Sequence, residues 1–182
     1  MGGRERILNA SRAVFGTKPY QEVAIAPILS DAQVQAPTLY YHFQDKEGLY
    51  VAWAKEKFSA LQLQIQRHGT LRDRLTGFAM LYFATVDFDI PQVLRDLITL
   101  TRDESREEIS SAYFQYVFEP ICGIFVAAMD LGEIGVEPIT RVSELFLAAL
   151  QSLVHSADRD FSEMSIWLVD RFLYGFEAKS RT

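Results

Sequence analysis

The sequence predicts an all-α protein of about nine helices, with an N-terminal head of three helices on a larger helical body. Apolar residues recur every three or four positions along most of the 182 residues, which is the spacing of amphipathic helices. No alternating run of apolar and polar residues is bounded by hairpin turns, so nothing indicates a strand. Several prolines and glycines fall between the periodic segments, where they mark helix ends.

Three short helices are expected in the head, at residues 4–16, 25–32 and 36–43. Pro19 ends the first of them. In the third, Leu39 and Phe43 are four residues apart and therefore share one face, which we expect to pack inward. Pro37 is tolerated because it falls in the first turn, where its missing N–H costs nothing.

Six longer segments make up the predicted body. Asp45 is the expected N-cap of the first of these helices, and Pro120 is expected to kink or divide the fourth. The charged stretch 102–106 is expected to be a junction, Gly132 and Gly135 a turn, and Ser162 or a neighbour the cap of the last helix. The segments are residues 46–66, 71–87, 91–101, 107–131, 138–155 and 162–176.

The second and third helices of the head, joined by the break at residues 33–35, form the pattern of a helix-turn-helix. With Leu39 and Phe43 facing inward, the third helix presents polar and aromatic groups outward. Such groups can reach base edges and phosphates in a DNA major groove. The predicted DNA-contacting residues are Gln35, Ala36, Pro37, Thr38, Tyr40, Tyr41, His42 and Lys46.

At these residues the sequence resembles a known family. Residues 38–43, followed by 45–50, resemble the signature of TetR-type transcriptional regulators, and residues 4–10 are similar to that family's first helix. The resemblance covers roughly residues 4–54. It implies a DNA-binding domain over residues 1–46 and a ligand-binding and dimerisation domain over residues 47–182.

The sequence departs from the family's usual pattern at several positions around the second helix. Val23 and Ala24 stand where a small polar pair usually touches phosphate, and their side chains cannot form hydrogen bonds. Gln33 replaces the usual turn glycine, so a positive φ there costs strain. Leu29 and Pro19 replace a usual alanine and a usual glycine. These substitutions bear on affinity and docking more than on fold.

The charge distribution is compatible with a nucleic-acid partner only in the head. The whole chain carries a net charge of −6, whereas residues 1–46 hold five basic and four acidic groups. The head is therefore +1 and the remainder −7. A head charge of +1 is a weak electrostatic footprint for DNA binding.

Aromatic residues on the middle helices indicate either an ordinary core or a cavity for an apolar or aromatic small molecule. The TetR resemblance implies a pocket in this region without choosing its lining. Polar selectivity would come from nearby arginines, which are equally compatible with a solvated surface. The predicted ligand-binding residues are Phe78, Tyr82, Phe83, Arg95, Thr99, Arg102, Tyr113 and Tyr116.

The last two helices are apolar over a wide arc, which favours a partner on more than one side. We interpret them as a four-helix interface in a homodimer, as the resemblance also implies, with burial inside one chain as the alternative. The predicted interface residues are Phe146, Ala149, Leu150, Leu153, Ile166, Val169, Phe172 and Leu173.

Catalysis has little support in the sequence. His42, His68 and His155 lie on separate segments without carboxylates at metal-binding spacing, so we expect no metal and no catalytic residues. There is no phosphate loop and no dinucleotide fingerprint, so no cofactor is expected. Cys122 lies in an apolar run typical of packing, and a lone cysteine excludes an intrachain disulfide.

We expect a cytoplasmic protein, because the lone cysteine, Cys122, fits a reducing compartment. Hydrophobic residues make up 49% of the chain, which is enough for a core. We see no apolar run near the roughly 18 residues of a membrane span and no signal segment, so no membrane partner is expected.

The sequence is therefore interpreted as a TetR-like, ligand-responsive repressor. It would bind operator DNA as a homodimer and be released by an apolar or aromatic small molecule. The alternative is a helical ligand-binding or sequestering dimer that has lost DNA binding, which the substitutions at Val23, Ala24 and Gln33 keep open. An enzyme is a distant third interpretation.

Overall fold

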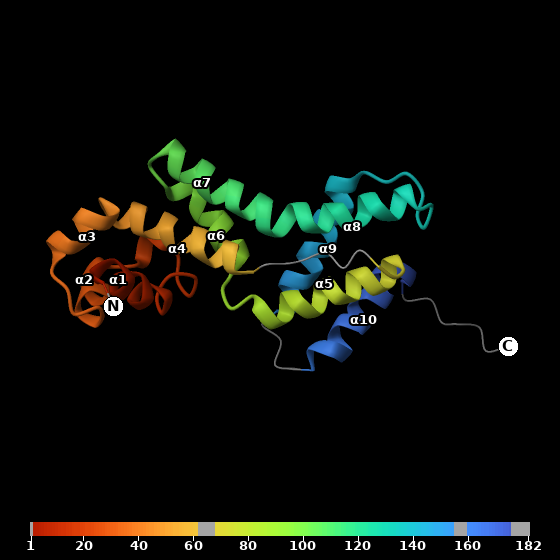
Figure 1. The fold of residues 1–182 in the computed structure, drawn as a ribbon, viewed down its shortest axis with the longest axis horizontal. Coiled ribbons are helices and arrows are strands. Elements are labelled where there is room, and N and C mark those ends of the chain that lie inside the picture. Colours follow the sequence, from red (N-terminus) through yellow and green to blue (C-terminus); the bar gives the residue numbers. More distant parts are fainter. Residues whose placement is uncertain (1, 62–67, 155–159, 176–182) are drawn as a thin grey trace. The chain divides into compact units, whose positions relative to one another are not determined.

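The computed structural model describes residues 2–61, 68–154 and 160–175, and within them it confirms the all-α class (Figure 1). The described residues contain helices and one isolated bridge, between Phe15 and Lys18. The α-helices are α1 Gly3–Arg12, α2 Ile25–Asp31, α3 Ala36–Phe43, α4 Lys46–Ala60, α5 Leu71–Thr85, α6 Ile90–Asp96, α7 Asp103–Tyr113, α8 Glu119–Asp130, α9 Ile139–Leu153 and α10 Phe161–Tyr174.

The chain is divided into two compact units. Unit 1 contains residues 1–60 and 87–114, so it joins α1–α4 to α6 and α7. Unit 2 contains residues 61–86 and 115–182, with α5, α8, α9 and α10. The helix-turn-helix is therefore packed into a unit that includes two later helices.

A cluster of aromatic rings fills the core of unit 1. The ring of Tyr50 lies 5.0 Å from Phe15 and 5.4 Å from Trp53, and Phe58 lies 5.5 Å from Phe88. The first helix ends at Arg12 rather than at residue 16 as expected. Gly16 follows at φ +80° and meets Trp53 so closely that a Cβ there would lie 2.9 Å from the indole. The chain leaves the helix early because Phe15 must enter the core beside this close approach.

The turn between α2 and α3 adopts the strained backbone that the sequence predicts. Gln33 has φ 52°, in the left-handed region that usually favours glycine. The guanidinium of Arg6 donates a 3.3 Å hydrogen bond from Nη1 to the Gln33 carbonyl oxygen, which helps to hold the turn. Helices α2 and α3 lie at the predicted residues to within one position.

A tight corner joins α3 to α4. The Asp45 carboxylate accepts a 2.8 Å hydrogen bond from the Gly48 amide, as expected of an N-cap. Gln44 turns the chain at φ 67°. Gly48 lies so near the Phe43 carbonyl that a Cβ would stand 2.0 Å from its oxygen. The end of α3 and the first turn of α4 therefore form one closely packed corner.

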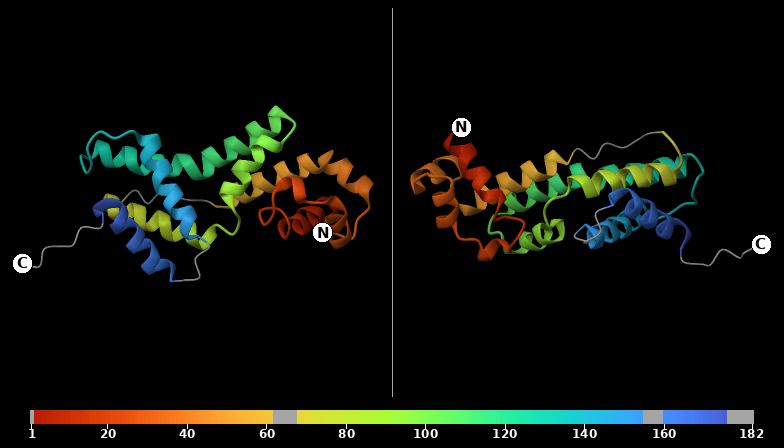
Figure 2. Two further views of the ribbon diagram at one scale, coloured as in Figure 1. Left: turned by 180° about the vertical axis from the view of Figure 1, so that it is seen from behind. Right: turned by 90° about the horizontal axis from the view of Figure 1, so that it is seen from below.

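Unit 2 packs α5 against α8, α9 and α10, and α5 and α10 run side by side in both views of Figure 2. Thr70 and Asp73 form a capping box at the start of α5. Arg72 on α5 forms an ion pair with Asp170 on α10, at 2.6 Å from Nε to Oδ1. Buried Arg74 pairs with Glu133, whose carboxylate also accepts from the Leu71 amide at 2.9 Å. These contacts secure the start of α5.

The long helix of the middle region differs from its expected form in two ways. It begins at Asp103, inside the stretch expected to be a junction, because Glu47 caps its first turn from another helix. It then passes through a π-helical segment, Phe114–Phe118, before α8. Pro120 lacks the N–H that would bond the Tyr116 carbonyl, and in a regular α-helix its ring would crowd that carbonyl. The wider π turn just before Pro120 accommodates both effects. Counted as one helix, Asp103–Asp130 brings the described total to the expected nine.

The predicted ends of three other helices are corrected. Helix α4 ends at Ala60, and the remaining positions expected to be helical, 62–66, lie outside the described residues. Helix α9 ends at Leu153, and His155 and Phe176 also lie outside the described part. The cap of α10 is Asp160 rather than Ser162, since its side chain accepts from the Glu163 amide at 2.9 Å.

One described helix passes the length and composition test for a membrane span, contrary to our reading of the sequence. This helix is Asp103–Asp130, whose most apolar window has a mean hydropathy of 1.3. Its two halves pack on other helices, α7 on α4 and α8 on α5 and α9. Such packing is also that of a core helix in a globular fold, so the test is weak evidence for a span.

Replacement of Gly48 by alanine is expected to destabilise the fold by about 2–4 kcal/mol, because the added Cβ meets backbone rather than a movable side chain. Helix propensity alone would favour alanine by up to about 1 kcal/mol, so the sign of the effect is diagnostic. The measurement is the urea midpoint. Gly135→Ala is the matched control, because nothing lies within 4 Å of the added atom. Equal midpoints for the two variants would contradict the tight corner.

Candidate nucleic-acid interface

Helix α3 has one face buried in unit 1 and the other exposed, as its sequence predicts. Leu39 and Phe43 are buried, and Tyr41 is 85% exposed. Ala36 and Thr38 are half-buried. The remaining predicted contact residues on this helix are exposed: Gln35, Pro37, Tyr40 and His42. An exposed surface of this kind offers hydroxyl, amide and imidazole groups to a partner without any movement of the backbone.

The start of α1 lies beside the same face, which the sequence analysis did not foresee. A Cβ on Gly3 would stand 2.8 Å from Cγ2 of Thr38 and 3.7 Å from Nε2 of His42. The exposed Arg4 places its guanidinium 5.4 Å from the centre of the Phe43 ring. The only signal in the sequence was a basic residue at the first turn of a helix, which is too common to be selected.

The basic groups of the head differ in how far they are already engaged. Arg12 forms an ion pair with Glu56, and Arg6 bonds the Gln33 carbonyl. Lys46 sits 4.3 Å above the Tyr20 ring, and burial lowers the pKa of its ammonium while Asp96 partly offsets this. Neither Arg4 nor the half-buried Lys46 forms an ion pair with another described residue.

The entry to α2 lacks side-chain hydrogen bonds, as the departures from the family pattern predict. Val23 is buried, and Ala24 is the N-cap of α2 without a capping side chain. Only backbone groups are present there to meet a phosphate.

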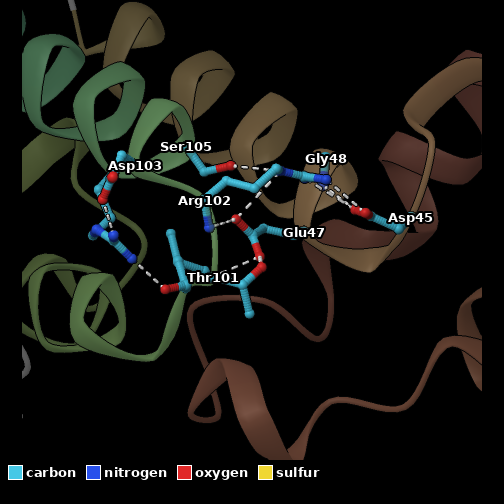
Figure 3. Close-up of polar contacts among 9 residues, drawn as sticks. Asp45, Glu47, Gly48, Thr101, Arg102, Asp103 and Ser105 are labelled. Carbon is cyan, nitrogen blue, oxygen red and sulfur yellow. Dashed lines mark hydrogen bonds and ion pairs between the residues drawn. The ribbon is translucent and has the colours of Figure 1, made fainter.

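Two buried carboxylates attach α6 and α7 to the head. The first is Glu47, on α4, whose Oε2 accepts from the Thr101 amide at 3.0 Å and the Thr101 hydroxyl at 2.6 Å (Figure 3). Its Oε1 accepts from the Arg102 amide at 3.0 Å. Burial alone would raise the pKa of Glu47, but the Thr101, Ser105 and Arg102 hydrogen bonds outweigh it and lower the pKa to about 2.

Arg102 joins this cluster from the other side. Its guanidinium meets Asp45 through two hydrogen bonds, Nη1 to Oδ2 at 2.6 Å and Nη2 to Oδ1 at 3.1 Å (Figure 3). Its Nε lies 3.4 Å from Glu47 Oε1 and donates to the Ser105 hydroxyl at 3.2 Å. We call Asp45, Glu47, Thr101 and Arg102 the α4–α7 clamp.

The second buried carboxylate is Asp96, on α6. It accepts from the Tyr20 amide at 3.1 Å, the Tyr50 hydroxyl at 2.8 Å and the Gln92 side chain at 2.8 Å. Burial and the nearby Asp96 charge raise the pKa of Tyr50, so its hydroxyl stays protonated as a donor. Burial, followed by the charges of Glu47 and Asp45, raises the pKa of Tyr20 to about 12.

The predicted ligand-binding residues do not form one set. Phe78, Tyr82, Phe83 and Tyr116 belong to unit 2, where the first three are buried on α5. The other four, Arg95, Thr99, Arg102 and Tyr113, belong to unit 1.

The prediction that the arginines select a ligand is not supported. Arg102 is engaged in the α4–α7 clamp, and Arg95 is exposed beside Gln92 and Asp89. Thr99 donates to the Asp96 carbonyl at 2.7 Å. Sequence spacing could not show that these polar groups have partners inside their own unit.

The predicted interface residues are also divided. Phe146, Leu150 and Val169 are fully buried within unit 2 of the single chain. Phe172 packs its ring 5.0 Å from Phe146. Ile166 is exposed, while Ala149, Leu153, Phe172 and Leu173 are half-buried. Exposed apolar residues that were not predicted lie on the same two helices: Leu145, Trp167 and Tyr174.

Comparison with known proteins agrees with this geometry. Residues 7–53 match the sequence profile of bacterial regulatory proteins of the tetR family. No curated protein sequence matches the chain.

Solved structures share the fold over nearly the whole chain. A tetR-family regulatory protein from Rhodococcus RHA1 is 17% identical, with 98% of this chain and 99% of that chain covered and a TM-score of 0.76. The regulator FadR from Bacillus subtilis, solved with stearoyl-CoA, is 17% identical, with 95% and 99% covered and a TM-score of 0.73. AibR, solved with isovaleryl coenzyme A and operator DNA, is 18% identical, with 93% and 97% covered and a TM-score of 0.74.

The matched residues span α1 to α4, and they contain the exposed helix and the tight corner described above. Residues 7–53 thus match the tetR family of bacterial regulatory proteins, and nearly the whole chain shares the fold of solved regulators of that family.

Proposed function

We propose that the protein is a homodimeric repressor that binds operator DNA through α3 and is released by an apolar small molecule. The observation that carries the proposal is the exposed polar and aromatic face of α3, held on the rigid corner at Gly48. Helices of this kind read base edges in the major groove, and two of them in a dimer fit half-sites roughly 34–36 Å apart.

Positive groups beside α3 support the DNA partner. Arg4 lies over the Phe43 ring at the end of α3, and Lys46 is the first residue of α4. Phosphate contacts by such residues supply most of the sequence-independent affinity. Gln35 and Thr38 are the residues we assign to base edges. Tyr40, Tyr41 and His42 are assigned to phosphates, with Ala36 and Pro37 providing close backbone approach.

The dimer proposal rests on apolar side chains that one chain leaves exposed. Leu145 on α9 and Ile166, Trp167 and Tyr174 on α10 are exposed, and large exposed apolar groups on neighbouring helices are typical of a protein interface. We therefore replace the buried Phe146, Leu150 and Val169 with Leu145, Trp167 and Tyr174. The residues that we keep are Ala149, Leu153, Ile166, Phe172 and Leu173.

An apolar effector in unit 2 is supported by two observations. Phe78, Phe125 and Phe146 pack their rings in its interior. The buried hydroxyls of Thr76 and Ser143 have no hydrogen-bond partner among the described residues, although buried hydroxyls nearly always have one. A small molecule could pack its apolar body against these rings and bond the two hydroxyls through a polar group. FadR and AibR, which share the fold, were solved with acyl-CoA molecules.

The alternative is a ligand-binding dimer that has lost DNA binding. The lack of hydrogen-bonding side chains at Val23 and Ala24 is the observation that favours it. The proposed repressor must therefore obtain its phosphate contacts from α3, Arg4 and Lys46.

The first test concerns DNA contacts. Arg4→Ala and Lys46→Ala are expected to weaken binding almost equally for all sequences and to lower the salt slope by about one unit per subunit.

Tyr41→Ala and His42→Ala should weaken binding without unfolding the protein, because both side chains are exposed. Gln35→Ala and Thr38→Ala should instead change sequence preference. Fluorescence anisotropy on DNA flanking the protein's own gene measures each effect.

Lys55→Ala is the control for charge. It removes a cation from the same unit, but its ammonium is paired with Glu108 on α7 at 2.5 Å. We expect no change in the salt slope. A wild-type protein without salt-dependent affinity for any genomic fragment would favour the sequestering alternative.

The second test concerns the dimer. Ile166→Glu or Trp167→Glu places two unpaired charges in a two-fold interface, which should raise the dimer dissociation constant by at least about 100-fold. Sedimentation velocity should then show monomers. Ile98→Glu is the control, because Ile98 is 87% exposed in unit 1. If the wild type sediments as a monomer at micromolar concentration, the interface assignment fails.

The third test concerns the effector. In a thermal-shift screen of stearoyl-CoA, isovaleryl-CoA and small aromatic acids, a compound at 100 times its dissociation constant should raise the melting temperature by roughly 5–10 °C. Ser143→Ala should reduce that shift while leaving the ligand-free protein nearly as stable, since its hydroxyl has no described partner to lose. Hits that leave DNA affinity unchanged would refute release by the effector.

A further inference from the structure

We propose that Glu47 and Arg102 are positioning residues for DNA reading: through the α4–α7 clamp they fix the corner that carries α3 to the start of α7. Neither residue is placed among the DNA contacts above. The inference rests on the proposed DNA binding and adds to it the residues that hold the reading helix in place.

The first step is the rigidity of the corner. Gly48 on α4 meets the Phe43 carbonyl of α3, at a separation that leaves no room for a Cβ. The Asp45 carboxylate caps α4 at the Gly48 amide. A group that holds Asp45 or Glu47 in place therefore also holds the end of α3, the helix proposed to read the DNA.

The second step is the capping of α7 by a residue of α4. The N-cap of α7 is Arg102, whose own side chain makes no capping hydrogen bond. Glu47 supplies the missing acceptor, with three hydrogen bonds to Thr101 and Arg102 at the start of the helix (Figure 3). A carboxylate at a helix N-terminus also faces the positive end of the helix dipole. The start of α7 depends on α4 for its cap.

The third step is the two-pronged contact of Arg102 with Asp45. One guanidinium donates to both oxygens of the carboxylate that caps α4. Such paired bonds fix the angle between the groups as well as their separation. Arg102 therefore sets the direction in which α7 leaves the corner.

The clamp is separable from the packing of the same two helices. Further along, α4 and α7 are joined by the Lys55–Glu108 ion pair and by the rings of Phe58 and Tyr113, 5.9 Å apart. These contacts remain when the clamp is opened. A change at Glu47 or Arg102 should therefore alter how the corner is held more than whether unit 1 folds.

The experiment uses the full-length protein and the DNA that the wild type selects from a random pool. Affinity is measured on the selected site and on versions with one base pair added or removed between its half-sites. Glu47→Gln and Arg102→Gln are expected to weaken binding to the selected site roughly 3- to 30-fold and to reduce discrimination between spacings. Arg102→Lys keeps the charge but loses the two-pronged geometry, so it should restore affinity better than spacing discrimination.

Glu108→Gln is the matched control, because it removes a carboxylate that joins the same two helices outside the clamp. It should leave affinity and spacing discrimination unchanged. If both clamp variants bind and discriminate like the wild type, the inference is overturned. If Glu47→Gln is too unstable to measure, the half-exposed Arg102 decides the question through its own variant. A wild type that selects no DNA would instead refute the proposed function.

Discussion

The attachment of Glu47 to the start of α7 is the interaction on which the arrangement of unit 1 depends. A buried carboxylate is costly unless its hydrogen bonds are satisfied, and here both oxygens are occupied. Because the folded-state pKa is lowered to about 2, the carboxylate contributes stability above its ordinary pKa. That contribution is lost as the pH falls toward 2. The same bonds bring residues separated by more than 50 positions into one cluster, and α6 follows through Asp96.

The sequence predicted those features that depend on neighbours along the chain. The four-residue spacing of Leu39 and Phe43 gave the buried face of α3, and Asp45 was identified as a cap from its position alone. The strain at Gln33 was also foreseen. Each of these three features depends on residues that lie close together in the sequence. The clamp was missed for the opposite reason, because Arg102 and Asp45 meet only when α7 returns to α4.

The apolar stripes of α9 and α10 show a second limit of sequence reasoning. A wide stripe indicates that a helix has partners, but it does not say whether they belong to the same chain. Phe146 on α9 and Val169 on α10 are buried within their own unit, whereas Trp167, also on α10, is exposed. Trp167 and Val169 lie about 200° apart around the axis of α10, so its apolar arc covers nearly opposite faces. Hydrophobicity alone does not say which of these faces meets its own chain.

The π segment before Pro120 sets the angular phase of the long helix. Each residue of an α-helix turns the chain by about 100°, so one added or missing residue would rotate everything beyond it away from its partners. A wider turn absorbs such a residue locally. Ile109 in unit 1 and Ile121 in unit 2 are both fully buried on this one helix, on either side of the segment. A widened turn between them therefore allows the buried face before it and the buried face after it to be set separately.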